Sequence, residues 1–136
     1  MKILVNFLMI AAIIFILVNL VYFFSNKTYR KSYFSTALFL KLFFVSVGVV
    51  IGFAFLYYMM SFKSLVIVEG NDSMAPVDPS FSNFLYFSGV TMLSVGYGDY
   101  VPVGPSRFFS LIESSLGVLL PTAYFMKALD SSKDEE

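Results

Sequence analysis

Three long apolar runs, separated by two more polar segments, form the hydropathy pattern of this chain. The runs cover residues 3–24, 38–60 and 108–126, each close to the about 20 apolar residues that a helix needs to cross a bilayer. The third run is the weakest, because Glu113 lies inside it and a charge at the bilayer centre costs about 2.5 kcal/mol or more. We therefore predict three transmembrane helices, the last of which buries one face against protein or water.

A shorter helix is predicted between the second and third runs. Residues 69–80 have the composition of a loop, rich in Gly, Asn, Asp, Ser and Pro. We predict that a helix follows from Pro79 to Met92, with Asp78 as its cap and Pro79 in its first position. Such a helix would be about 20 Å long, too short to span a bilayer but typical of re-entrant segments.

The composition supports a membrane protein. The 136 residues are 58% hydrophobic and 19% aromatic, and only 13% are charged, which is too apolar for a soluble domain of this length. Cysteine and histidine are both absent, which removes thiolate and imidazole groups as metal ligands, nucleophiles or bases. The net charge is zero, and no basic stripe suggests a nucleic-acid partner. We expect a protein that contacts membrane lipid and is neither an enzyme nor the carrier of a resident cofactor.

The distribution of charge predicts the orientation. Residues 25–37 contain three basic residues and no acid, whereas residues 61–79 contain one lysine and three acids. The positive-inside rule then places the first loop in the cytoplasm, the second loop and the N-terminus outside, and the C-terminus in the cytoplasm of a cell (inner or plasma) membrane. A cleaved signal peptide over residues 1–24 is the alternative, but it lacks a small-residue cleavage site and would place the basic loop outside. The charged residues are Lys27, Arg30 and Lys31 in the first loop and Lys63, Glu69, Asp72 and Asp78 in the second.

The segment from Ser94 to Asp99 carries the candidate chemistry. Gly96 and Gly98 alternate there with larger residues. Because glycine tolerates positive φ, this alternation lets successive carbonyl groups point the same way. A turn is the ordinary interpretation of Gly-Tyr-Gly-Asp by itself. Between two membrane spans, however, free carbonyls are tolerated only if they are buried in protein or line a water-filled cavity, which favours a strand that lines a wet space over a plain turn.

The sequence around this segment resembles a known family. Residues 86–99, Tyr-Phe-Ser-Gly-Val-Thr-Met-Leu-Ser-Val-Gly-Tyr-Gly-Asp, are similar to the pore helix and selectivity filter of two-span potassium channels, and the similarity extends over roughly residues 38–129. It implies an all-α membrane protein with an outer helix, a re-entrant pore helix, an extended filter and an inner helix, assembled as a four-fold symmetric tetramer. The division would be an additional transmembrane helix and a basic cytoplasmic loop (1–37), the pore domain (38–129) and a short charged tail (130–136).

The resemblance also implies roles for particular residues. Dehydrated K⁺, the one expected ligand, would be coordinated by backbone carbonyls that replace its hydration water, as is established for potassium channels. One strand supplies one oxygen per layer, so a ring of four copies is needed to form a cage. Ser94 stands where the family usually has threonine, and we expect this to alter the innermost ion site without loss of selectivity. The implied filter residues are Ser94, Val95, Gly96, Tyr97 and Gly98, with Val90, Thr91 and Asp99 as supports.

The third run contains candidate gating residues. Gly117 matches the inner-helix hinge of the family, and Pro121 removes a helical hydrogen bond, so we expect a kink. Two ordinary helix imperfections are the alternative. Phe125 is a candidate for a hydrophobic constriction, although core packing explains it equally well. Glu113 is expected to accept hydrogen bonds behind the filter rather than to touch permeating ions.

Gating and function leave alternatives open. The first run has no arginine array and few residues follow position 129, so we expect gating within the pore or by a separate regulatory subunit. Asn6 and Asn19 could mediate helix contacts of the first run, or that run could be a simple anchor. The leading interpretation is a potassium-selective channel subunit. A non-conducting or modulatory subunit and a weakly selective cation channel are the alternatives.

Overall fold

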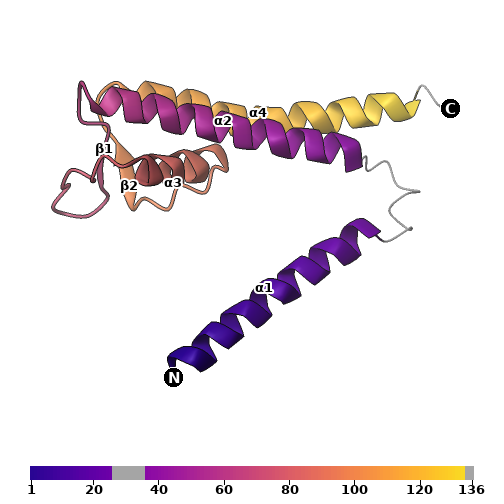
Figure 1. Ribbon diagram of the computed structural model, residues 1–136. Helices are drawn as coiled ribbons and strands as arrows, with labels where there is room; N and C mark the ends of the chain where they lie inside the picture. Colours follow the sequence, from indigo (N-terminus) through magenta and orange to yellow (C-terminus); the bar gives the residue numbers. More distant parts are fainter. Residues whose placement is uncertain (26–35, 134–136) are drawn as a thin grey trace.

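The computed structural model describes residues 1–25 and 36–133. Three of its helices are long and apolar enough to cross a membrane, as predicted within the described part of the chain. The predicted orientation depends on Lys27, Arg30 and Lys31 in the basic loop. These three residues and the tail residues 134–136 lie outside the described residues. In chain order the elements are α1 (Lys2–Ser25), α2 (Thr36–Ser61), β1 (Ile67–Glu69), α3 (Phe81–Met92), β2 (Tyr100–Pro102) and α4 (Ser106–Lys133) (Figure 1).

Helices α2, α3 and α4 pack against one another, and their shared core lies near α3 (Figure 1). Tyr57 of α2 and Phe87 of α3 are both buried there, and their ring centroids lie 5.2 Å apart in an edge-to-face arrangement typical of aromatic pairs. Much of the remaining apolar surface of α2 and α4 is exposed. That surface is available for lipid or for other chains. The core residues are Ala54, Tyr57, Val66, Ile67, Val77, Phe84 and Phe87.

A small antiparallel sheet closes the loop end of this unit. β1 pairs with β2, with Val68 opposite Val101 and Glu69 opposite Tyr100. Val68 also forms an isolated bridge with Pro76. This sheet was not predicted, because strands of three residues are too short to show an alternating pattern. Its consequence is that the loop after α2 lies directly beside the segment that follows α3.

Helix α3 begins later than the sequence predicted. Its N-cap is Ser80, whose backbone is extended (φ −99°, ψ 146°) and whose Oγ accepts a hydrogen bond from the Asn83 backbone N–H at 3.3 Å. The prediction of Asp78 as the cap and Pro79 as the first helical residue was therefore wrong. Serine is as good a cap as aspartate. The Asp78 carbonyl accepts hydrogen bonds from the Ser80 N–H and the Asn83 side-chain amide, at 2.8 and 3.0 Å.

Helix α1 lies apart from the other helices in Figure 1, and no residue of its candidate membrane span, Lys2–Tyr22, is buried. The side-chain amide of Asn19 donates to the Phe15 carbonyl at 2.8 Å within the same helix. Such local bonding satisfies a polar group without a partner helix. The surface of α1 thus suits a lipid environment, and the predicted contact role of Asn6 stays a prediction.

Candidate functional site

The backbone of the segment after α3 alternates in handedness. Ser94, Gly96 and Gly98 have φ values of 56°, 49° and 82°, whereas Val95 and Tyr97 between them have negative φ. Such alternation turns successive peptide groups to one side, unlike the zigzag of a β-strand. The positive φ expected of both glycines is confirmed. That of Ser94 was missed, because serine has no preference for this region and only its surroundings keep it there.

The N-terminal end of the segment Ser94–Gly98, which we call its inner end, folds back onto the last turn of α3. The backbone N–H groups of Val95 and Gly96 both donate to the Val90 carbonyl, at 3.0 and 3.1 Å. The Ser94 N–H donates to the Thr91 carbonyl at 3.0 Å. These bonds use carbonyls that a helix C-terminus leaves without partners. Val90 and Thr91 therefore contact the segment through their main chains, whereas the sequence suggested support without indicating how.

The C-terminal end of the segment, at Gly98 and Asp99, is attached to two different parts of the fold, and we call it the outer end. The Asp99 carboxylate accepts a hydrogen bond of 2.8 Å from the Tyr86 hydroxyl of α3. Its backbone carbonyl accepts one of 2.8 Å from the Gly70 N–H, just after β1. The bond to Asp99 raises the pKa of Tyr86 above its ordinary value. No role was predicted for Tyr86 or Gly70, because each lies far along the chain from Asp99, the residue to which it bonds.

Glu113 of α4 is fully buried and joins three helices. Its carboxylate accepts a hydrogen bond of 2.7 Å from the Tyr57 hydroxyl of α2 and a second, short one from the Ser88 hydroxyl of α3. The expectation that Glu113 accepts hydrogen bonds is confirmed. Two donors are needed because a buried carboxyl group without partners is very unfavourable. Tyr57 was missed, since an apolar helix shows no signal for a hydroxyl that reaches another helix.

Gly117 lies against the end of α3. A Cβ atom at position 117 would overlap the Met92 carbonyl oxygen and lie 2.8 Å from the Met92 carbonyl carbon. One turn earlier, the Ser114 hydroxyl donates to the Thr91 carbonyl at 3.3 Å. Gly117 does not have a left-handed φ, so space alone requires a glycine. This packing role was not predicted, and the hinge role stays a prediction.

The predicted gate residues lie further along α4. The helix continues through Gly117 and Pro121 as one element. Proline has no N–H, so the Gly117 carbonyl four residues earlier receives no helical hydrogen bond. The Phe125 side chain is 65% exposed and does not belong to the core cluster. The core-packing alternative for Phe125 thus finds no support within this chain.

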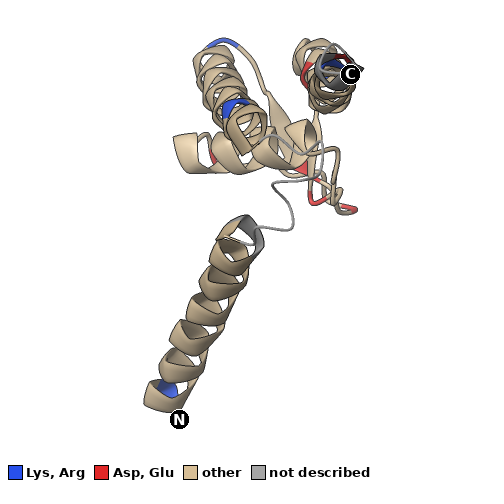
Figure 2. Ribbon diagram, turned by 90° about the vertical axis from the view of Figure 1, so that its right-hand side faces the viewer, with Lys and Arg blue, Asp and Glu red and all other residues tan. Residues whose placement is uncertain are grey.

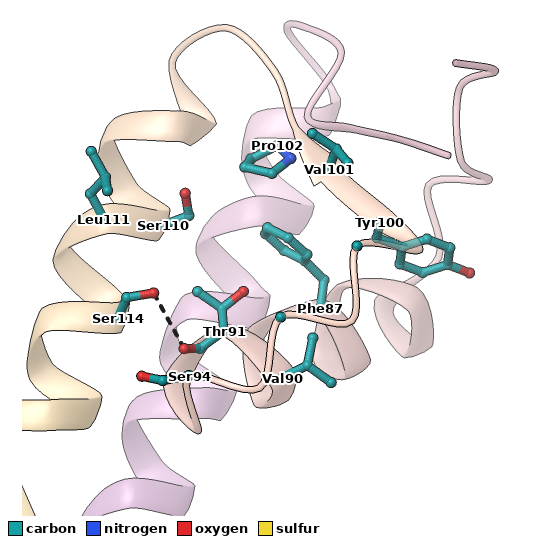
Figure 3. Close-up of a pocket in the computed structure, with 12 residues that line it drawn as sticks. Phe87, Val90, Thr91, Ser94, Tyr100, Val101, Pro102, Ser110, Leu111 and Ser114 are labelled. Atoms are coloured by element: carbon teal, nitrogen blue, oxygen red, sulfur yellow. Dashed lines mark hydrogen bonds between the residues drawn. The ribbon is translucent and has the colours of Figure 1, made fainter. Parts of the chain in front are cut away.

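A groove of about 460 Å³ opens between the segment and α4 (Figure 3). Ser94, Gly96 and Gly98 line one side of it, and Ser110, Leu111 and Ser114 line the other. Among the residues that the structure describes, no group of three or more His, Cys, Asp or Glu could hold a metal ion.

Comparison with known proteins identifies the family. Residues 44–130, more than half of the chain, match the family described as "Ion channel", and the chain belongs to this family. It is an integral membrane protein with helices of membrane-spanning length. No solved structure matches the chain.

Two curated relatives are similar over part of their length. Protein LctB of Bacillus caldotenax is 33% identical over 73 residues, which are 52% of this chain and 54% of that protein. Protein LctB of Geobacillus stearothermophilus is 32% identical over 84 residues, which are 60% of this chain and 63% of that protein. The chain thus spans less than two thirds of either relative.

Proposed function

We propose that this protein is a potassium-selective channel subunit that conducts dehydrated K⁺ past the backbone carbonyls of Ser94, Val95, Gly96 and Tyr97. The observation that carries the proposal is the alternation of φ from Ser94 to Gly98, in a segment that lies between two helices long enough to span the membrane. Carbonyls turned to one side form a row that can replace the hydration water of an ion. The preference for K⁺ rests on the resemblance of Ser-Val-Gly-Tyr-Gly-Asp to the potassium-channel filter.

The proposed assembly is a ring of four copies with a shared axis. Leu93, Val95 and Tyr97 are 72%, 46% and 71% exposed in the isolated chain. Contiguous exposed apolar side chains mark a surface that another protein covers. A closed ring would cover these side chains with neighbouring copies and would bring four carbonyl oxygens to each layer of the ion path.

Electrostatics support cation entry from the loop side. Glu69 ends β1, and Asp72 and Asp78 lie in the loop between β1 and α3. Figure 2 draws the acidic residues in red, several of them in coil segments. Fixed negative charge at a pore mouth raises the local concentration of cations. With this loop outside, the C-terminal end of α3 points inward, and its partial negative charge favours a cation in the centre of the membrane. This orientation places the N-terminus outside and the C-terminus in the cytoplasm.

The proposed gate is in α4. Gly117 and Pro121 together leave a weak point in the helix, because the Gly117 carbonyl receives no helical donor. Phe125, one turn beyond Pro121 and 65% exposed in the isolated chain, would face the proposed axis and narrow the path by dewetting. A separate regulatory subunit would act on this part of α4.

Recording from purified protein in planar bilayers tests the proposal. With K⁺ and Na⁺ on opposite sides, the reversal potential should lie close to the equilibrium potential of K⁺, and Ba²⁺ should block the current because its size is close to that of K⁺. A permeability ratio near one would contradict potassium selectivity and favour a weakly selective cation channel. A tetramer without current would favour a non-conducting, modulatory subunit.

A further inference from the structure

Gly70 touches the outer end of the proposed ion path. A Cβ atom at position 70 would overlap the Gly98 carbonyl oxygen, lie 2.8 Å from the Gly98 carbonyl carbon and lie 3.3 Å from Cγ2 of Val101. Gly70 does not have a left-handed φ, so its backbone would accept an ordinary residue. Only the close approach of two backbones excludes a side chain here.

Gly98 adds little steric restraint of its own to this contact. Gly98 has a φ of 82°, and a Cβ atom built on it would meet no atom within 4 Å. A glycine in open space can rotate its peptide at little cost. The Gly98 carbonyl oxygen lies against the Gly70 backbone, and the neighbouring hydrogen bond of 2.8 Å from the Gly70 N–H to the Asp99 carbonyl holds the two segments together.

Gly70 itself is held from the core. It follows β1 directly, and Val66, Ile67 and Val68 before it are at most 3% exposed. The Glu69 N–H donates to the Ala75 carbonyl at 2.8 Å, which closes the loop into a hairpin. A buried strand thus carries Gly70 to a fixed place beside the outer mouth. The contact joins the exposed loop after β1 to the last peptide of the proposed filter.

We infer that Gly70 is a positioning residue that fixes the backbone of Gly98 and Asp99 at the outer end of the proposed filter and thereby sets the affinity of the outermost cation site. This inference rests on the proposed function. It gives the loop after β1 a direct mechanical influence on the filter. A shift of the loop would displace the Gly98 backbone and with it the adjoining Tyr97 carbonyl, and cations arriving from outside would bind more weakly.

The test compares Gly70→Ala with Gly52→Ala, since a Cβ atom at position 52 would meet nothing within 4 Å. Ba²⁺ is added to one side of a planar bilayer at a time. For Gly70→Ala, external block should weaken at least about fivefold, because the added Cβ would displace the Gly98 backbone and a shift of about 1 kcal/mol corresponds to a factor of about five. Internal block should change less than about twofold. Gly52→Ala should match the wild type on both sides.

A second variant covers the case in which Gly70→Ala fails to assemble. Replacing the Gly70 amide by an ester removes the N–H donor to Asp99 without adding an atom to the contact. External block should then weaken about twofold or more, with internal block unchanged. Wild-type block in an assembled Gly70→Ala channel, or equal changes on both sides, would overturn the inference. A wild-type protein that does not conduct K⁺ selectively would instead refute the proposed function.

Discussion

The two ends of the segment from Ser94 to Gly98 are held in contrasting ways. At each end a glycine lets a backbone approach a carbonyl: Gly117 at Met92 and Gly70 at Gly98. The inner contact lies between helices, one turn from the fully buried Glu113. The outer contact lies in an exposed loop and depends on main-chain hydrogen bonds. The inner end is therefore part of the core, whereas the outer end can change its geometry while the core stays folded.

Removing the buried carboxyl group is the most severe test of this contrast. Glu113→Ala leaves the Tyr57 hydroxyl without its acceptor, whereas the Ser88 hydroxyl can still donate to the Val50 carbonyl at 2.8 Å. One buried donor without a partner costs about 1–3 kcal/mol, and the cavity left by the missing side chain adds to this cost, so we expect a loss of about 2–5 kcal/mol. Thermal unfolding of the purified protein in detergent measures it. Glu113→Gln, which keeps one acceptor oxygen, should lose less. Equal stability of Glu113→Ala and wild type would show that the inner end does not depend on this core.

A smaller effect is expected where α4 meets α3. Gly117→Ala forces the helix away from the Met92 carbonyl, and overpacking of this kind typically costs about 1–3 kcal/mol. The same unfolding experiment applies, with Gly52→Ala as the control at an open position. If Gly117→Ala changes gating but leaves the unfolding temperature at the wild-type value, Gly117 acts as a hinge alone and the packing role is wrong.

The smallest effect on stability is expected at the outer end. Tyr86→Phe removes the hydrogen bond to the Asp99 carboxylate, but both residues are exposed, so water can replace the lost partner. The unfolding temperature should not change, whereas external Ba²⁺ block should shift relative to internal block. A clear loss of stability in Tyr86→Phe would break the contrast between the two ends, because the outer contact would then belong to the core.

Several predictions from local patterns are confirmed, and those that failed are informative. The apolar runs predict the three long helices because backbone groups in a membrane must bond within their own segment. The alternation of glycine predicts positive φ at Gly96 and Gly98. The start of α3 was wrong because Asp78 and Ser80 are both good caps, and two residues of sequence do not decide between them.

What the sequence by itself determined is everything that depends on neighbouring residues: the long helices, the conformational freedom of Gly96 and Gly98, and the need of Glu113 for partners. Only the tertiary structure decided which partners are met. The Tyr57 hydroxyl reaches Glu113, the Gly70 backbone reaches Gly98, and the backbone of Ser94 takes a left-handed φ that its side chain does not favour. These features depend on how elements that are distant in the sequence pack together. Local preferences of the chain do not specify such contacts.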